Sequence, residues 1–410
     1  MTATPARPAF RLARVARAAS ITLGACLLVS LGCSSASDAP AGAAGSGGSG
    51  ATGGGDTGGS GDTGGSSDTG GSSATSGGGT GGDSTGGSGA TAGSSGTGGS
   101  STGGTGGEGD AAAPQAFESY TYTGVGRTLT WLLRRPADES GPPKPLYLAL
   151  HGCYETADEF AAIAHLADLS DAHDAYVVVP EQDTAANPLR CWNWFDPASQ
   201  QRTGGEAEIL AGIAQQAMTM GSVNAHAVHV FGLSAGAAMA VVLAATWPDL
   251  FASAGSVSGC PYRGTPCLQT PSSASIAALA QDVTQAMGSQ ARLVPLIVFQ
   301  GDADSTVPPQ NAQLLVDQWL AAADLIDDGA SNGSVGASPS STSSGTSPGG
   351  RDYDIATYDA PGGKSLVERW LIHGGGHAWP GGAANHAYSD PAGPDATEAI
   401  ASFLDAHEQP

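Results

Sequence analysis

The sequence is poor in basic residues. Of its 410 residues, 15 are Lys or Arg and 38 are Asp or Glu, so the formal net charge at pH 7 is −23. Proteins that bind nucleic acids neutralise phosphate groups with Lys and Arg. The composition therefore argues against a nucleic-acid partner, although net charge alone says little about the fold.

The sequence also lacks an apolar run long enough for a membrane span. Its best candidate, residues 18–32, is shorter than the ~20 residues that cross a bilayer. A basic start precedes this run (Arg7, Arg11, Arg14 and Arg17), and small residues follow it. This order is typical of an export signal. We therefore expect residues 1–33 to direct export, with the mature protein extracellular, periplasmic or on an outer membrane.

The end of this segment, residues 31–35, resembles a bacterial lipobox, although Ser30 replaces the usual aliphatic residue. The resemblance implies cleavage before Cys33 and a lipid on its thiol, which would be the protein's only membrane contact. A rival site at Cys26 and ordinary secretion without a lipid remain open.

Residues 34–113 contain no aromatic side chain and consist almost entirely of Gly, Ser, Thr, Ala and scattered acidic residues. Such a segment cannot bury enough apolar surface to offset the entropy of ordering it, so we expect a disordered tether. A second polar run, 329–350, predicts a flexible, disordered surface insertion. The remainder, 114–410, holds all seven Trp and suits one α/β domain, expected to be monomeric.

Cysteines are few: six in the chain, of which four lie in this domain. An even number in an exported domain favours two disulfides. Cys260 and Cys267 enclose a short loop and are natural mates, which leaves Cys153 with Cys191, but three connectivities stay open. Neither C-x-x-C nor His-rich spacing is present, so we expect no metal site.

Residues 228–245 read as a β-branched strand, a Gly-Leu-Ser-Ala-Gly turn and a helix of small apolar residues. Gly232 and Gly236 allow a turn tight enough to lift Ser234 to the end of the strand, where the N–H of Ala235 points toward a developing oxyanion. The helix N-terminus adds positive potential there. The alternative is a glycine-rich corner with a surface serine, but the flanking strand and helix favour a hydrolase nucleophile.

An acid and a base follow two later predicted strands. The strand at 293–299 leads to Asp302 and Asp304; we favour Asp304 as the carboxylate that orients a histidine, because Asp302 suits a local turn. The strand at 367–372 leads to a glycine-rich loop in which we favour His377 over His373 as the base. The order Ser, Asp, His matches that of the α/β-hydrolases.

Three further elements are predicted before the serine. A buried strand at 146–150 leads into His151-Gly-Cys153, and the loop after such an early strand carries the second oxyanion donor. We expect that donor to be the N–H of Cys153, with the His151 side chain packing against or orienting the loop. A helix at 158–167 and a strand at 176–180 should follow.

These motifs together resemble the extracellular poly(3-hydroxybutyrate) depolymerases and the related feruloyl and acetylxylan esterases. The matching pieces cover nearly all of 117–405: 150–153, 180–182, 187–188, 191–195, 232–236, 301–304, 375–379 and 390–395. The resemblance implies an α/β-hydrolase fold, with a mostly parallel sheet flanked by helices, serine esterase activity and no cofactor. It makes Ser234 the nucleophile, Asp304 the acid and His377 the base, with backbone oxyanion donors at Cys153 and Ala235.

Two departures from the family pattern stand out. Ala237 replaces a glycine after the serine turn, which should only tighten helix packing. Polymer-degrading members often carry a separate substrate-binding domain after the catalytic one, and this sequence ends at Pro410 without it. We therefore do not expect attack on a crystalline polyester surface, while short or amorphous esters remain open as substrates.

Aromatic residues near these motifs suggest a substrate wall: Trp192, Trp194, Phe195 and Trp379. Core packing around a disulfide is the alternative for Trp192 and Trp194, whereas Trp379 lies two residues from the predicted base. The sequence thus predicts hydrolysis of polyhydroxybutyrate-type esters or of feruloyl or acetyl esters of plant polysaccharide. A peptidase of the same fold and a non-catalytic lipid-anchored binding protein are the alternatives.

Overall fold

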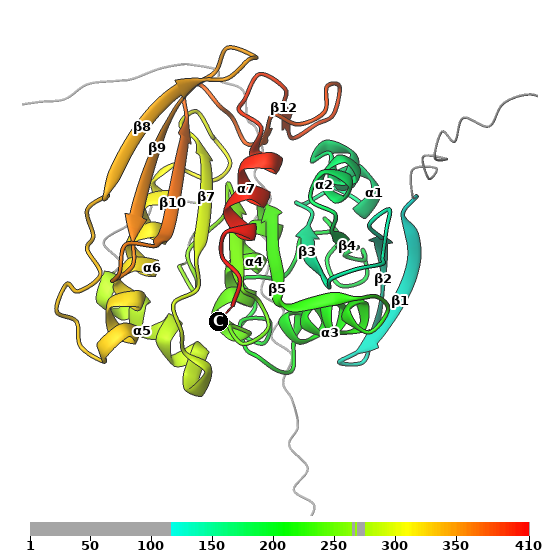
Figure 1. Cartoon of the computed structure of the whole chain (residues 1–410), viewed down its shortest axis with the longest axis horizontal. Coiled ribbons are helices and arrows are strands. Elements are labelled where there is room, and N and C mark those ends of the chain that lie inside the picture. Colours follow the sequence, from blue (N-terminus) through cyan, green and yellow to red (C-terminus); the bar gives the residue numbers. More distant parts are fainter. Residues whose placement is uncertain (1–115, 265–266, 269–274, 410) are drawn as a thin grey trace, which may run out of the picture. The chain divides into compact units, whose positions relative to one another are not determined.

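The computed structural model of the chain describes residues 116–264, 267–268 and 275–409 (Figure 1). The predicted export signal, the lipidated Cys33 and the tether at 34–113 lie outside these residues. Within the described ranges, no helix combines the length and apolar character needed to cross a bilayer.

A ten-stranded sheet organises the described chain, in the spatial order β1-β2-β4-β3-β5-β6-β7-β10-β9-β8. The six central strands, β4 to β10 in this order, run parallel, whereas β1, β2, β9 and β8 are antiparallel to their neighbours. The bounds are β1 Glu118–Gly124, β2 Arg127–Arg134, β3 Lys144–Leu150, β4 Tyr176–Pro180, β5 Val223–Leu233, β6 Ser253–Val257, β7 Leu296–Gly301, β8 Ser341–Thr346, β9 Asp352–Asp359 and β10 Ser365–Ile372. A small parallel pair joins β11 (Trp379–Pro380) to β12 (Ser389–Asp390).

Helices cover both faces of this sheet, as Figure 1 shows for α4 and α7. The helices are α1 Ala157–Ile163, α2 Leu166–Ala172, α3 Glu206–Met218, α4 Ala235–Thr246, α5 Ile276–Met287, α6 Gln310–Asp328 and α7 Ala396–Asp405, with a short 3₁₀ turn at Gly288–Gln290. Apolar residues of α3, α4, α5 and α6 belong to one core cluster, and those of α1, α2 and α7 belong to another.

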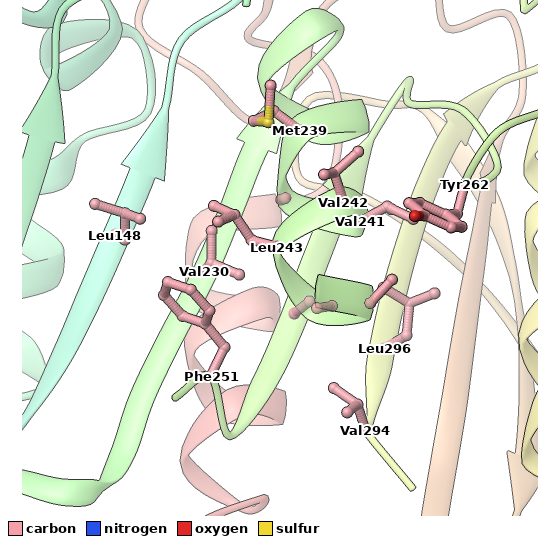
Figure 2. Close-up of a cluster of buried hydrophobic side chains, with 14 of the residues drawn as sticks. Leu148, Val230, Met239, Val241, Val242, Leu243, Phe251, Tyr262, Val294 and Leu296 are labelled. Atoms are coloured by element: carbon pink, nitrogen blue, oxygen red, sulfur yellow. The ribbon is translucent and has the colours of Figure 1, made fainter. Parts of the chain in front are cut away.

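The two clusters follow from the alternation of side chains along the strands. On β3, Leu148 faces the first cluster and Tyr147 the second. Figure 2 shows the first cluster, where Leu148 and Val230 from the sheet meet Met239 and Leu243 from α4. Because α4 is buried on all sides, the small side chains in its sequence are required for its close approach to the sheet.

Most predicted elements are present, and the differences have local causes. β4 coincides with the predicted strand at 176–180. The expected helix at 158–167 is instead two helices, because His165 adopts a left-handed backbone with φ 49° between them. The strand expected from 293 begins at Leu296, since Pro295 has no N–H to contribute to the ladder.

The prediction of a disordered insertion over 329–350 is wrong for Ser341–Thr346, which forms the edge strand β8. This segment pairs antiparallel with β9 through backbone hydrogen bonds, which do not require apolar side chains. Before it, the buried carboxylate of Asp324 accepts hydrogen bonds from the N–H groups of Gly333 and Val335. Backbone pairing and this carboxylate order a segment whose composition alone suggests disorder.

Candidate active site

Three predicted site residues follow the carboxyl ends of three parallel strands. Ser234 comes directly after β5, Asp304 lies in the loop after β7, and His377 lies in the loop after β10. Because these strands run in the same direction, their carboxyl ends share one edge of the sheet. The fold therefore brings side chains that are far apart in the sequence to one place.

The three side chains form a continuous hydrogen-bonded series. His377 Nε2 lies 2.9 Å from Ser234 Oγ, and His377 Nδ1 lies 2.8 Å from Asp304 Oδ2. The Asp304 side chain is fully buried and that of His377 is 10% exposed. An imidazole held in this way by a carboxylate can accept the proton of a serine hydroxyl.

The serine is held in a strained turn. Ser234 has φ 57° and ψ −117°, and its N–H donates to the carbonyl oxygen of Val257 on β6. A Cβ atom on Gly236 would lie 2.1 Å from the carbonyl oxygen of Leu150, and one on Gly232 would lie 2.5 Å from the same atom. Only glycine at these two positions allows β5, the turn and α4 to pack this closely against the end of β3.

The Asp304 carboxylate is fully engaged. Its Oδ1 accepts from the N–H groups of Thr306 and Val307, both at 2.9 Å, and its Oδ2 accepts from Gln300 Nε2 at 3.1 Å as well as from His377. Burial alone would raise the pKa of Asp304, but the hydrogen bond and charge of His377, together with the two N–H groups, hold it below its ordinary value. The carboxylate therefore stays ionised and accepts the Nδ1–H of His377.

The loop after β3 and the start of α4 share one cavity with the serine. Cys153 and Ala235 both line the cavity around Ser234. Neither of their N–H groups is a donor in the hydrogen bonds of the described residues, so both are free to bind a substrate oxygen. Ala235 begins α4, where the free N–H groups of the helix terminus also favour negative charge.

His151 fixes the shape of this loop. Its Nδ1 lies 2.7 Å from the carbonyl oxygen of Gly152, and its Nε2 lies 3.0 Å from the backbone nitrogen of Gln182. A carbonyl can only accept and an amide N–H can only donate, so the ring is neutral with its proton on Nδ1. Burial lowers the pKa of His151 to about 4, which keeps it in this form.

Two disulfides brace the site. Cys153 is bonded to Cys191, which joins the loop after β3 to the loop after β4, and Cys260 is bonded to Cys267 after β6. These are the pairs that the sequence spacing favours. Cys153, Cys191 and Cys260 all line the cavity, so both bonds shape its walls.

The cavity at Ser234 has a volume of 390 Å³ and a mostly apolar lining. Large apolar side chains that are exposed to solvent gather at it. Of the six such residues in the described ranges, five line this cavity: Tyr154, Leu189, Phe195, Leu268 and Tyr388. An apolar wall around a hydroxyl, an imidazole and two free N–H groups is suited to an ester with an apolar acyl group.

Comparison with known proteins places the chain in a family. A sequence model of the family described as Esterase PHB depolymerase matches residues 129–338. The chain belongs to this family. The resemblance inferred from the sequence motifs is thereby confirmed.

Two curated relatives of this Esterase PHB depolymerase family protein extend the comparison. Poly(3-hydroxyalkanoate) depolymerase C of Paucimonas lemoignei is 32% identical over 255 residues, which cover 59% of this chain and 57% of the relative. The probable acetylxylan esterase A of Aspergillus clavatus is 30% identical over 189 residues, which cover 42% of this chain and 60% of the relative. This chain thus spans 57% to 60% of the length of these two relatives.

A solved structure agrees with the α/β-hydrolase fold. An acetyl xylan esterase from Aspergillus awamori superposes with a TM-score of 0.56 at 20% identity, and the match covers 70% of this chain and 99% of that one. At this level of identity the likeness concerns the fold, which is the mostly parallel, helix-flanked sheet expected from the sequence.

Two of the predicted substrate-wall residues in this family member do not reach the cavity. Trp192 is fully buried and packs its ring against that of His151, with 5.3 Å between centroids. Trp379 is also fully buried; it packs against Phe160 and Phe231, and its indole N–H donates to Thr397 Oγ1 at 2.9 Å. The predictions for Trp192 and Trp379 are therefore wrong, because both indoles fill the core beneath the loops.

Trp194 does line the cavity, together with its neighbour Phe195. Four of the other apolar wall residues (Tyr154, Leu189, Leu268 and Tyr388) and the buried Glu155 are not among the residues predicted from the sequence. A usable signal was present for three of the four: Tyr154, Leu189 and Leu268 stand within two positions of a cysteine in turn-rich segments. Trp192 stands next to Cys191 in the same kind of segment and is fully buried, so this signal selects candidates for the cavity wall and the packing of the loops decides which of them are exposed.

The described residues contain no group of three or more His, Cys, Asp or Glu side chains that could hold a metal ion. The series from Ser234 to Asp304 can activate a hydroxyl with protein groups alone.

Proposed function

We propose that this protein is a serine carboxylic-ester hydrolase in which Ser234 is the nucleophile, His377 the general base and Asp304 the orienting acid. The observation that carries the proposal is the hydrogen-bonded series of these three side chains at the base of an apolar cavity. Membership of the Esterase PHB depolymerase family supports it.

The reaction begins when Ser234 Oγ attacks the ester carbonyl carbon and its proton passes to His377 Nε2. Asp304 stabilises the resulting imidazolium, and the N–H groups of Cys153 and Ala235 bind the oxyanion of the tetrahedral intermediate. Each such donor contributes about 3–4 kcal/mol to stabilising the transition state. The intermediate collapses when the C–O bond to the alcohol breaks and the alcohol leaves with the proton from His377.

Water completes the cycle. His377 accepts a proton from a water molecule, which attacks the acyl-Ser234 carbonyl and forms a second tetrahedral intermediate. Collapse of this intermediate returns the proton to Ser234 Oγ and releases the carboxylic acid.

The cavity favours a polyester oligomer of the polyhydroxybutyrate type over an acylated polysaccharide. Its lining is mostly apolar, with Thr306, Tyr154 and Tyr388 as the polar side chains besides Ser234, His377 and Glu155, whereas a sugar ring would need several hydrogen-bonding partners. The relative from Paucimonas lemoignei is named for a poly(3-hydroxyalkanoate), which agrees with this choice. The preference for polyester oligomers is tested by comparing their turnover with that of feruloyl and acetyl esters.

The same proposal includes the part of the chain outside the described residues. We propose that residues 1–33 direct export, that Cys33 carries a lipid, and that 34–113 tethers a monomeric catalytic domain at 114–410. Two disulfides support an oxidising compartment. Fractionation of cells that express Cys33→Ala tests the anchor: the variant should leave the membrane fraction, and its retention there would disprove lipidation at Cys33.

Ser234→Ala tests the catalytic proposal. Loss of the nucleophile should lower kcat toward p-nitrophenyl butyrate by about 10⁴-fold or more. Ser343→Ala, at an exposed position on the edge strand β8, is the control and should retain parental activity. Parental turnover by Ser234→Ala, or phosphonate labelling of the parent at a different serine, would exclude the mechanism. Hydroxybutyrate oligomers, feruloyl sugars and acetylated xylan, assayed in parallel, then rank the substrates.

A further inference from the structure

Glu155 is a buried carboxyl group that the proposed mechanism does not use. It lies between the loop that carries Cys153 and the start of α1, lines the cavity, and is only 3% exposed. Its Oε2 accepts from the N–H of Gly152 at 2.6 Å. Its Oε1 is buried without a hydrogen-bond partner among the described residues. A buried carboxylate with one partner is costly, so this group needs an explanation.

Among the residues that the structure describes, no basic side chain forms an ion pair with Glu155. The charged group that acts on it from α1 is Glu159, which carries the same sign. On the loop after β4, Arg190 is paired with Glu181. From the loop after β10, His377 faces the same cavity but is hydrogen-bonded to Asp304 and Ser234.

These surroundings favour the neutral acid. The dominant effect is burial, which raises the pKa of Glu155 to about 7; the charge of Glu159 acts in the same direction, and the Gly152 N–H opposes both. His151, on the preceding side of the loop, is itself neutral and adds no charge.

Glu155 and His151 hold the two ends of Gly152. Glu155 binds its N–H, and the Nδ1–H of His151 binds its carbonyl oxygen. In a trans peptide the carbonyl of one residue and the N–H of the next point in opposite directions. By fixing the Gly152 carbonyl, the His151 ring therefore fixes the direction of the Cys153 N–H, the predicted second oxyanion donor, while Glu155 fixes the preceding peptide through the Gly152 N–H.

The carboxyl also lies close to the reacting serine. Glu155 Oε2, the Leu233 carbonyl oxygen and Ser234 Cβ all lie within 3.5 Å of the position that a Cβ atom on Gly152 would occupy. Negative charge on Glu155 would therefore stand beside the place where the substrate oxygen becomes negative. In a cavity with few polar groups, that repulsion is weakly screened.

We propose that Glu155 is a positioning residue for the oxyanion hole, and that it acts through Gly152 in its protonated form. The inference rests on the proposed esterase function. The neutral acid keeps the hydrogen bond to the Gly152 N–H, which holds the His151–Gly152 peptide immediately before the Cys153 donor, and it does so without placing a negative charge beside the oxyanion. Ionisation keeps the bond but opposes the developing charge.

The pH dependence of kcat/KM toward p-nitrophenyl butyrate, measured from pH 5 to 9.5 with the intact protein, tests this role. The parent should lose activity by about tenfold or more as Glu155 ionises. Glu155→Gln keeps an acceptor for Gly152 and cannot ionise, so the decline on the alkaline side should disappear. Glu155→Ala should be less active than Glu155→Gln at every pH, because the loop is no longer held.

A matched control separates Glu155 from its neighbour. Glu159→Gln removes the nearby charge but leaves the bond to Gly152, so the alkaline decline should persist. An alkaline decline that survives in Glu155→Gln, or one that disappears equally in Glu159→Gln, would overturn the assignment. Equal activity of Glu155→Ala and the parent across the pH range would also overturn it.

Direct titration distinguishes this inference from the proposed function. The ¹³C resonance of the Glu155 carboxyl, assigned by its absence in Glu155→Gln, should titrate near neutral pH in the Ser234→Ala protein, which requires no turnover. A midpoint in the ordinary range for glutamate overturns the protonated form even if the parent is an active esterase. Failure of the esterase proposal is recognised separately, by unchanged turnover in Ser234→Ala.

Discussion

Two Asp–His pairs join the same two loops but differ in their exposure to solvent and in the third group that each histidine contacts. Asp304–His377 and Asp302–His373 both connect the loop after β7 to the segment after β10, with Nδ1–Oδ2 distances of 2.8 and 2.9 Å. The first pair is buried. In the second, the side chains are 40% and 41% exposed. Residue type and contact distance are therefore insufficient to identify a catalytic pair.

The third partner distinguishes the two histidines. His377 Nε2 faces the Ser234 hydroxyl, whereas His373 Nε2 faces the carboxylate of Asp354 at 3.0 Å. A ring between two carboxylates donates from both nitrogens and is protonated. The hydrogen bonds to Asp302 and Asp354 accordingly raise the pKa of His373. His373 therefore has no free acceptor nitrogen, and only His377 is arranged to act as a base.

The largest expected effect is on kcat, when the carboxylates of Asp304 and Asp302 are replaced one at a time. Asp304→Asn should lower kcat by about 10⁴-fold, because an amide facing Nδ1 favours the tautomer that cannot accept the serine proton. Asp302→Asn should change kcat by less than about threefold, as expected for an exposed pair. Both are measured with p-nitrophenyl butyrate. Losses of similar size in the two variants would show that the pairs are functionally equivalent.

A second test compares two buried carboxyl groups, Asp304 and Glu155, by their effect on the pH dependence of stability. Asp304 has His377, whereas Glu155 has no such partner and its pKa is raised from 4.5 to about 7. The folded state therefore binds this proton more tightly than the unfolded chain, so stability is lost as pH rises from 4.5 to about 7 and then stays constant.

Glu155→Gln abolishes this loss because the amide does not ionise. We expect its Tm to exceed that of the parent by about 4 °C at pH 8.5, and the difference to shrink toward zero at pH 4.5. Differential scanning fluorimetry at both pH values measures it. A pH-independent difference would mean that packing, not ionisation, separates the two proteins.

The smallest expected effect is on thermal stability, when the exposed Asp302–His373 pair is removed. The folded-state pKa of His373 is raised above 6.5, so its stabilising contribution is present below that value and is lost as pH rises through the folded pKa. His373→Gln should lower Tm by about 1–3 °C at pH 5.5 and leave it unchanged at pH 9.5. Added salt should reduce the difference at pH 5.5, because exposed ion pairs are screened.

The sequence was most informative where a short segment determines its own geometry. The run around Ser234 predicted a strand, a tight turn and a helix, and β5 and α4 lie there. Asp304 and His377 could be selected because each follows a strand, and strands of a parallel sheet end at one edge. The structure brings these three residues together, as the chain order suggested.

The sequence did not predict how deeply an individual side chain is buried. Trp194 and Trp379 look alike in the sequence, yet one lines the cavity and the other fills the core beside Phe160 and Phe231. Burial of this kind depends on how separate loops pack on one another. For the same reason the burial of Glu155 was not anticipated, since its sequence neighbours do not reveal that it lacks a basic partner among the described residues.

The Cys153–Cys191 bond has a practical consequence for anyone who produces this protein. One end of the bond is Cys153, whose N–H is the proposed oxyanion donor, and the other end, Cys191, is part of the cavity wall. If recombinant material is made in a reducing cytoplasm, both regions lose their covalent brace at once. Weak turnover by such a preparation would then be mistaken for the wrong choice of ester, so the oxidation state of these thiols should be quantified before substrates are compared.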